Sequence, residues 1–249
     1  AAFVSQPAMA RYDSIGINYA DLRIPDARIA AAIAQALGPA ERVINVGAGT
    51  GSYEPTDRIV TAVEPSIEMI RKRRQPAAAV VQASADALPF DDNAFDAAMA
   101  ILTIHHWPDK QAGLREVRRV TQGRIVLLTF DPAQRPWLTD YLPELARLDD
   151  AQMPAMADYA RWLGPVRIEP LLVPHDCTDG FLYAYWRRPE AYLDAHIRSG
   201  SSSFWALPGL EPGLARLADD LSSGAWEERY GELRHQPAYD AGYRLVIAD

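Results

Sequence analysis

The chain has 249 residues, of which 49% are hydrophobic, and its 25 Lys and Arg against 33 Asp and Glu give a formal charge of −8. This apolar content excludes a disordered chain, the length suits one α/β domain, and the single cysteine, Cys177, excludes a disulfide framework and favours a reducing cytoplasm. The acidic balance argues against a nucleic-acid partner. No apolar run approaches the ~18 residues of a membrane span, and the N-terminus shows no basic-then-apolar targeting pattern.

Short apolar runs alternate with helical patterns over the first 131 residues. Such alternation is typical of βαβ units on a parallel sheet. Helices are predicted at residues 25–37, from the Ser66 N-cap to Arg74, and from Pro108–Asp109 to Gly123. Strands are predicted at residues 42–46, 59–63, 78–82, 95–102 and 124–130. Joined by right-handed crossovers, these elements predict a doubly wound sheet with helices on both faces.

The last third of the chain has a different pattern. A helical stretch over residues 142–163 is interrupted at Pro154, and strands are predicted at 166–173 and 243–248, the last one antiparallel. About seventy residues between these two strands are too many for a structureless loop, so they predict a helical, aromatic-rich insertion. We expect a single domain over residues 1–249, made of a cofactor-binding core at 1–131, a helical segment at 132–165 and a substrate-side insertion at 174–238.

A glycine-rich turn follows the strand at 42–46. Its glycines, Gly47, Gly49 and Gly51, allow positive φ angles and close approach of backbone N–H groups to a ligand. Glu64 ends the next strand 17 residues after Gly47, near the spacing at which a carboxylate binds a ribose diol. Ser52 stands where a dinucleotide fingerprint has its last glycine, and no P-loop lysine follows. The pattern predicts a nucleoside site, with a ligand-free tight turn as the alternative.

Four motifs in this order carry a family resemblance. They are Gly47-x-Gly49-x-Gly51, Val63-Glu64-Pro65-Ser66, the stretch from Ala85 to Phe90, and Phe95-Asp96-Ala97. Together they resemble class I S-adenosylmethionine-dependent methyltransferases, in particular the subgroup that includes the quinone-biosynthesis enzymes. The resemblance covers roughly residues 11–131 and implies a seven-stranded, mostly parallel sheet whose last strand is antiparallel.

The resemblance also implies roles for single residues in binding S-adenosylmethionine. The three glycines would follow the amino-acid and ribose portions of the cofactor, and Glu64, next to Pro65, would hold the ribose hydroxyls. Asp86 and Ala87 would meet the adenine edge, and Leu102 and Thr103 would line the sulfonium side. Tyr12, Tyr19 and Arg23 match an N-terminal helix that closes over the cofactor. Arg23 could pair with the cofactor carboxylate, or it could be a solvated surface charge.

Methyl transfer from a sulfonium is an in-line displacement, so a base is needed only when the reactive atom of the acceptor carries a proton. His106 is the first candidate base, His105 the second and Tyr19 a third, while the histidines could instead only shape the loop after the fourth strand. His175 is a rival candidate in a turn capped by Asp176. The adjoining Cys177 is expected to be a buried, inert thiol, and no spaced ligand set predicts a metal site.

Aromatic residues of the insertion predict an apolar acceptor pocket, or alternatively a small core beneath a lid. The residues expected at the acceptor are Trp107, His175, Tyr183, Trp186, Phe204 and Trp205. The one basic run, Arg71 to Arg74, is expected to be a solvated helix end rather than a nucleic-acid patch.

The leading hypothesis is S-adenosylmethionine-dependent methyl transfer to a small, aromatic metabolite on oxygen, nitrogen or carbon, with an indole carbon among the candidates. Two alternatives remain: an NAD(P)-dependent oxidoreductase on a Rossmann-like sheet, and a non-catalytic cofactor-binding subunit. We expect a small-molecule methyl acceptor as partner, no nucleic acid, no membrane, no metal, and a monomer or homodimer.

Overall fold

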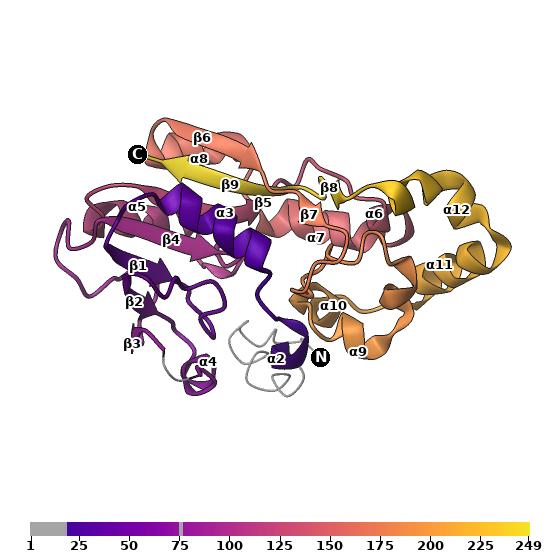
Figure 1. Cartoon of the computed structure of the whole chain (residues 1–249), viewed down its shortest axis with the longest axis horizontal. Coiled ribbons are helices and arrows are strands. Elements are labelled where there is room, and N and C mark those ends of the chain that lie inside the picture. The colour runs from indigo at the N-terminus through magenta and orange to yellow at the C-terminus, as the bar shows by residue number, and fades with distance from the viewer. Residues whose placement is uncertain (1–18, 75–76) are drawn as a thin grey trace, which may run out of the picture.

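The computed structural model describes residues 19–74 and 77–249 and contains one seven-stranded sheet with the strand order β3-β2-β1-β4-β5-β9-β6 (Figure 1). The strands are β1 (Arg42–Val46), β2 (Ile59–Val63), β3 (Ala79–Val81), β4 (Ala97–Ile101), β5 (Ile125–Phe130), β6 (Val166–Pro170) and β9 (Tyr243–Ala248). Strands β1 to β5 pair in parallel, whereas β9 lies antiparallel between β5 and β6. The predicted doubly wound sheet with an antiparallel last strand is confirmed.

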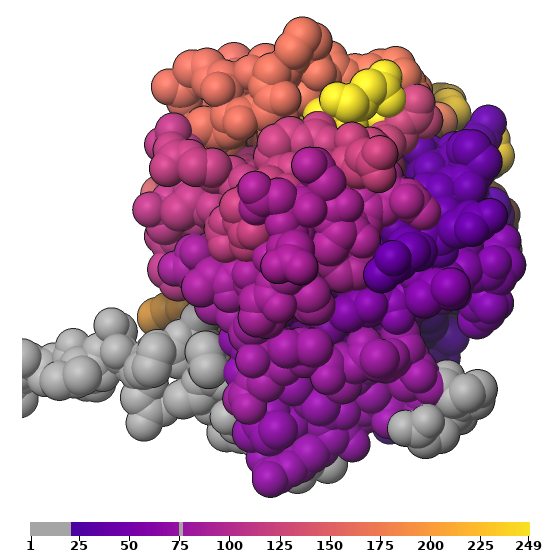
Figure 2. Space-filling model, turned by 90° about the vertical axis from the view of Figure 1, so that its left-hand side faces the viewer, coloured from indigo at the N-terminus to yellow at the C-terminus, as the bar shows by residue number. Residues whose placement is uncertain are grey.

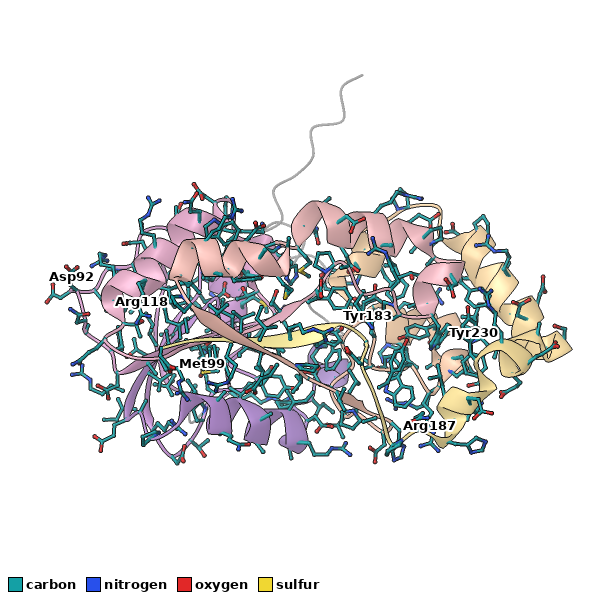
Figure 3. The ribbon with its side chains drawn as sticks, turned by 90° about the horizontal axis from the view of Figure 1, so that it is seen from above. Asp92, Met99, Arg118, Tyr183, Arg187 and Tyr230 are labelled. Carbon is teal, nitrogen blue, oxygen red and sulfur yellow. The ribbon has the colours of Figure 1, made fainter. Side chains whose placement is uncertain are left out.

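Helices cover both faces of the sheet because its central strands are apolar on both sides. On one face, α3 (Ala27–Leu37) packs Ile29, Ile33 and Leu37 into a core with β4 and β5. On the other face, α5 (Lys110–Val120) and α8 (Met156–Leu163) bury Val117 and Tyr159. Figure 3 shows the sheet from above with these helices on its two sides.

Side-chain caps fix where three helices of the sheet half begin. Asp26 accepts a hydrogen bond from the backbone N–H of Arg28 at the start of α3. Asp109 accepts the backbone N–H of Ala112 at the start of α5, where the sequence predicts a helix to begin. Ser66, the predicted N-cap, accepts the backbone N–H of Met69 at the start of α4 (Ile67–Arg71). Each cap satisfies a backbone donor that the first helical turn leaves unpaired.

The last third is helical and aromatic-rich, as expected. Its helices before β6 are α6 (Leu138–Tyr141), α7 (Pro143–Gln152) and α8, and the predicted break at Pro154 separates α7 from α8. Between β7 and β8 lie η2 (Pro189–Leu193), α9 (Ala195–Arg198), α10 (Ser202–Ala206), α11 (Glu211–Ser223), α12 (Ala225–Tyr230) and η3 (Gly231–His235). Helices α11 and α12 stand at one end of the molecule in Figure 1, whereas α8 lies beside β6 at the sheet end, onto which Figure 2 looks.

The strand predicted at 166–173 is shorter than expected. Strand β6 ends at Pro170, and β7 (Val173–Pro174) pairs instead with β8 (Ala238–Tyr239) in a separate two-stranded ribbon. Proline has no N–H to donate to a sheet, so Pro170 and Pro174 each end a run of strand pairing. Within the described part of the chain, no helix combines the length and the apolar character needed to cross a bilayer.

Candidate functional site

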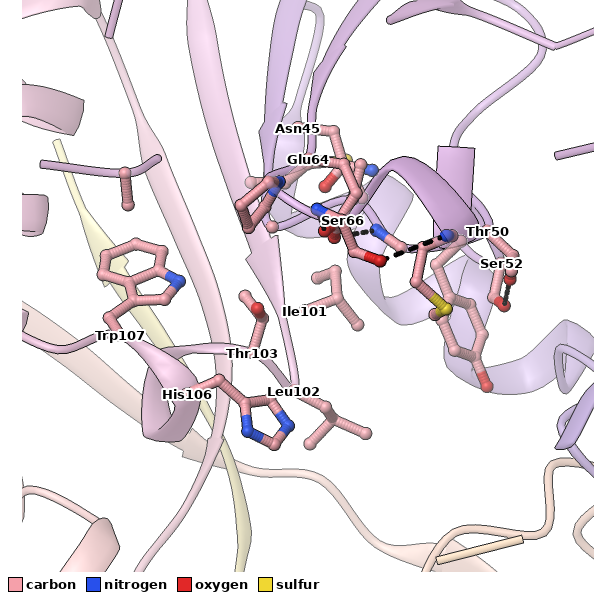
Figure 4. A pocket seen from close by; sticks show the side chains of 18 of the residues that line it. Asn45, Thr50, Ser52, Glu64, Ser66, Ile101, Leu102, Thr103, His106 and Trp107 are labelled. Atoms are coloured by element: carbon pink, nitrogen blue, oxygen red, sulfur yellow. Dashed lines mark hydrogen bonds between the residues drawn. The ribbon is translucent and has the colours of Figure 1, made fainter. Parts of the chain in front are cut away.

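A cavity of about 450 Å³ opens at the carboxyl ends of β1, β2 and β4. This edge is where open α/β sheets bind their ligands. Figure 4 shows Glu64 and Ser66 on one side of this cavity, and Leu102 and His106 on the other. The lining residues are Arg23, Asn45, Gly47, Ala48, Gly49, Thr50, Ser52, Tyr53, Glu64, Pro65, Ser66, Met69, Ser84, Ala85, Met99, Ile101, Leu102, Thr103, His106, Trp107 and Pro108. We call it the first cavity.

The glycine turn borders the first cavity and needs its glycines for two reasons. Gly47, Gly49 and Gly51 have φ angles of +70°, +54° and +85°, which side-chain-bearing residues rarely adopt. A Cβ on Gly47 would also overlap the side chain of Thr103, which follows β4. The turn therefore brings backbone close to the end of β4, leaving a cradle that a larger residue would fill.

Glu64 places a carboxylate in the first cavity. The residue is 7% exposed; its Oε1 accepts the backbone N–H of Gly49 at 2.9 Å and its Oε2 accepts that of Ser66 at 2.8 Å. Burial raises the pKa of Glu64, while the two N–H groups act in the opposite direction. The same carboxylate thus joins the glycine turn to the end of β2, and its role in binding a ribose stays a prediction.

Arg73 corrects the expectation that the basic run is a solvated helix end. Its side chain is buried, forms an ion pair with Glu54, and donates to the carbonyl oxygen of Gly49 at 3.2 Å. Asn45 donates to the other oxygen of Glu54 at 2.8 Å. Arg71, with a 67% exposed side chain, and the exposed Arg74 behave as predicted. The acid at position 54, close to the glycine turn, is the sequence signal for this buried pair.

The segment after β4 forms the wall between the first cavity and a second, smaller cavity described below. Leu102 has a φ of +50°, a left-handed conformation that is rare for a residue with a branched side chain and often marks a functional site. The short helix η1 (Ile104–His106) follows and presents the two histidines. Burial and the charge of Lys110 lower the pKa of His106 to about 4, and burial lowers that of His105 well below its usual value. Both imidazoles are therefore neutral at neutral pH.

A second, smaller cavity of about 80 Å³ adjoins the first and shares Arg23, Leu102 and His106 with it. Its remaining lining residues are His105, Phe130, Asp149, Gln152, Met153, Phe181, Leu182, Tyr183, Ser201, Ser202, Ser203 and Tyr243. They come from β5, α7, β9 and the insertion, so the sheet half and the insertion both contribute. We call this space the second cavity.

Asp179 lies at the junction of three segments beside both cavities. Its Oδ1 pairs with Arg23 Nε at 2.6 Å, and its Oδ2 accepts the hydroxyl of Tyr53 at 2.8 Å. Asp179 is 1% exposed, so this carboxylate is a buried connection among the segment before α3, the residues after the glycine turn and the insertion. Arg23 is accordingly a partly buried cavity residue rather than a solvated surface charge.

The structure places the predicted site residues in several groups. Those lining the first cavity are Arg23, Gly47, Gly49, Glu64, Pro65, Leu102, Thr103, His106 and Trp107, and those lining only the second are His105 and Tyr183. Gly51 belongs to the turn without lining a cavity, and Asp86 and Ala87 are exposed, whereas their neighbours Ser84 and Ala85 do line the first cavity. Tyr19 begins α2 (Tyr19–Leu22) and its role stays a prediction; Tyr12 lies outside the described residues.

Four residues expected at the acceptor lie outside the linings of both cavities. His175 is half-exposed beside Asp176, and Trp186 is a core residue whose indole N–H donates to the carbonyl oxygen of Val173 at 3.1 Å. Trp205 donates to the carbonyl oxygen of Ser199, and Phe204 packs on the aromatic core. Their roles in acceptor binding stay predictions.

Sequence reasoning missed Asp149, Met153 and Tyr243 in the second cavity. Asp149 lies in an ordinary helical pattern, and nothing in the sequence spacing distinguishes it from the exposed Asp150 that follows it. The predicted buried thiol of Cys177 is confirmed, and burial raises its pKa to about 12. Across residues 19–74 and 77–249, no three His, Cys, Asp or Glu side chains gather in a way that could hold a metal ion.

Comparisons with known proteins agree with this geometry. A family profile described as a methyltransferase domain matches residues 44–127. The demethylmenaquinone methyltransferase of Renibacterium salmoninarum is 34% identical over 129 residues, which are 48% of this chain and 53% of that protein. The chloroplastic 2-methyl-6-phytyl-1,4-hydroquinone methyltransferase 1 of Oryza sativa is 28% identical over 51% of this chain and 42% of that protein. The chain thus spans about half the length of these curated relatives.

A solved structure matches almost the whole chain. It is a candidate methyltransferase from an antibiotic biosynthesis pathway of Anabaena variabilis, with 37% identity, a TM-score of 0.85, and coverage of 92% of this chain and 99% of that one. The YcgJ protein of Bacillus subtilis, at 18% identity and a TM-score of 0.50, shares the fold. With the profile match and a full-length relative of this identity, the chain belongs to the S-adenosylmethionine-dependent methyltransferases.

Proposed function

We propose that this chain transfers the methyl group of S-adenosylmethionine, bound in the first cavity, to a small aromatic acceptor bound in the second. The observation that carries the proposal is that the two cavities meet at Leu102 and His106. A donor and an acceptor placed on either side of this wall would be in contact. Four aromatic rings, Phe130, Phe181, Tyr183 and Tyr243, line the second cavity together with polar side chains, which favours a flat acceptor that also carries a polar group.

The residues of the first cavity fit S-adenosylmethionine. Glu64 offers a buried carboxylate to ribose hydroxyls, and the glycine turn leaves a cradle for the ribose and the amino-acid portion. Arg23 offers a cation to the amino-acid carboxylate while it remains paired with Asp179. Ser84 and Ala85, rather than the exposed residues at 86 and 87, are the lining candidates for the adenine edge.

The bound cofactor supplies an activated methyl group on a sulfonium. The main task of the chain is then to hold the acceptor in line with the bond that breaks, and such alignment is worth ~7–11 kcal/mol. Where the reactive oxygen, nitrogen or carbon of the acceptor carries a proton, the neutral imidazole of His106 is the proposed group that receives it. An indole carbon remains among the candidate acceptor atoms.

The comparisons support an aromatic acceptor without identifying it. The two curated relatives are named for quinone and hydroquinone substrates, but they match only about half of this chain. The profile match ends at residue 127, before the insertion, where part of the second cavity is built. We therefore assign residues 174–238 to the acceptor side and residues 1–131 to the cofactor side of one enzyme.

Calorimetry with S-adenosylhomocysteine and NAD⁺, followed by a methyl-transfer assay that detects released S-adenosylhomocysteine, tests this function. We expect binding of the nucleoside and none of the dinucleotide. His106→Asn is expected to lower turnover of an active acceptor without changing nucleoside affinity. His175→Asn, which removes an exposed imidazole outside both cavities, is the matched control. A protein that binds NAD⁺ in preference to the nucleoside would contradict the proposed function. Equal turnover in both variants would contradict only the role of His106 as the base.

A further inference from the structure

We propose that the second cavity selects acceptors that carry a protonated amine, and that the carboxylate of Asp149 holds this amine. The inference rests on the proposed function, because it takes the second cavity as the acceptor site. It adds a charge requirement that neither the family nor any relative named above supplies. Three features carry it: the environment of the carboxylate, the charge balance of the cavity and the aromatic walls.

Asp149 lies on α7, is 4% exposed and lines the second cavity. Its Oδ2 accepts the hydroxyl of Tyr183 at 2.9 Å. Among the described residues, no side chain or backbone group donates to its Oδ1. Since Oδ1 is also not among the buried side-chain atoms that lack a partner, this oxygen is open to the cavity and left for a ligand there.

The nearby cations do not balance the charge of Asp149. Arg23 shares the cavity, but Asp179 holds it at 2.6 Å. The charge of Arg135 acts on Asp149 and lowers its pKa, but the guanidinium of Arg135 pairs with the exposed Asp150 at 2.9 Å.

The two histidines of the second cavity contribute no charge, because burial keeps their pKa values below neutrality. Burial also raises the pKa of Asp149, to about 6, which still leaves it mostly ionised at pH 7.5. The cavity thus has a net negative charge that an ammonium group would neutralise.

The walls of the second cavity suit a cation as well as an apolar ring. Phe130 stacks on Tyr183 with ring centroids 5.2 Å apart, and Phe181 meets Tyr243 edge-on at 4.8 Å. The faces of aromatic rings attract ammonium groups, and the attraction increases where water is excluded. Figure 3 shows Tyr183 where the sheet meets the insertion, so these rings belong to the boundary between the two halves.

An amine held in this way is an anchor and not the methylated atom. A protonated nitrogen has no free electron pair with which to attack a methyl group, whereas the far end of the same ligand would lie toward Leu102 and His106. The inferred acceptor class is therefore an aromatic amine-bearing metabolite, such as an arylalkylamine, that is methylated away from its ammonium group.

The test measures binding to protein saturated with S-adenosylhomocysteine. The probes are two pairs with the same ring and opposite charge: tryptamine against indole-3-propionate, and phenethylamine against 3-phenylpropionate. We expect the wild type to bind each amine at least tenfold more tightly than the matching acid. Asp149→Asn should remove this preference, while Asp150→Asn, which removes an exposed carboxylate one residue away, should change it less than twofold.

Three results would overturn the inference. The wild type could bind the acids as tightly as the amines or more tightly, it could bind no amine at millimolar concentration, or the amine preference could persist in Asp149→Asn. Should Asp149→Asn fail to fold, Tyr183→Phe, which keeps the carboxylate, must retain the preference. Nucleoside affinity is measured separately in each variant. Loss of nucleoside binding in the wild type contradicts the proposed function, whereas intact nucleoside binding without an amine preference contradicts only the charge requirement.

Discussion

Asp149→Asn is expected to make the protein more stable at neutral and alkaline pH, although it should weaken acceptor binding. Burial raises the pKa of this carboxyl from 3.8 to about 6, an effect that the Tyr183 hydrogen bond only partly offsets. The ionised form is thus disfavoured in the folded protein relative to the unfolded chain. Asparagine keeps an oxygen that can accept the Tyr183 hydroxyl, and it removes the buried charge.

The magnitude follows from the two pKa values. Each pKa unit corresponds to ~1.36 kcal/mol, so ionised Asp149 destabilises the folded state by about 3 kcal/mol at pH 8. The penalty is absent below pH 3.8, grows as the pH rises, and reaches its full value above pH 6. At pH 5 it is about 1.6 kcal/mol by the same linkage relation.

Urea unfolding of wild type and Asp149→Asn at pH 5 and pH 8 measures these differences. We expect the variant to have the larger free energy of unfolding at both values, with a gap about twice as large at pH 8. Asp150→Asn, at an exposed position, should show a small difference with little pH dependence. A destabilised Asp149→Asn protein, or a gap that is constant between the two pH values, would refute the assignment of a strained buried charge.

Three further predictions concern the first cavity. Glu64→Gln should weaken the binding of S-adenosylhomocysteine at least tenfold in calorimetry, because the amide NH₂ of the glutamine would face a backbone N–H that donates to the carboxylate in the wild type. Unchanged affinity would contradict a role of Glu64 in nucleoside binding. Gly47→Ala should abolish nucleoside binding, whereas Gly209→Ala, with a similar φ but open surroundings, should reduce only stability, by ~1 kcal/mol. Arg73→Met should lower the free energy of unfolding in urea titrations by ~3 kcal/mol or more, because it leaves Glu54 buried without its partner. Arg71→Met, at an exposed position, should change this free energy by less than ~0.5 kcal/mol. Equal effects of the two substitutions would contradict the importance of the buried Arg73–Glu54 ion pair.

The cofactor half was predictable because its signals are local. Strands β1, β2 and β9 have the predicted bounds, and Asp26, Ser66 and Asp109 are helix caps that the sequence itself identifies or places at the start of a helix. The glycine turn and Glu64 could be paired from spacing alone, since parallel strands bring their carboxyl ends to one edge. The strand predicted at 166–173 was too long because the run of apolar residues continues past Pro170, where β6 ends.

The last third of the chain was less predictable because burial there depends on long-range packing. Trp186 and Tyr183 are both aromatic residues of the same short segment, yet one fills the core and the other lines the second cavity. Arg71 and Arg73 are neighbours in one basic run, yet only one is buried, because Glu54 lies beneath it. Asp149 and the exposed Asp150 differ only in which way the helix turns them. Periodicity does not encode these distinctions.

Asp179 limits how freely the insertion at residues 174–238 can be exchanged. The insertion does not simply rest on the cofactor half: one of its carboxylates holds Arg23 before α3 and the hydroxyl of Tyr53 after the glycine turn. An insertion transplanted from another methyltransferase would leave these two donors without their acceptor unless it brought an acid to the same place. Engineering of acceptor range in this scaffold should therefore redesign the walls around position 179 and keep the acid itself.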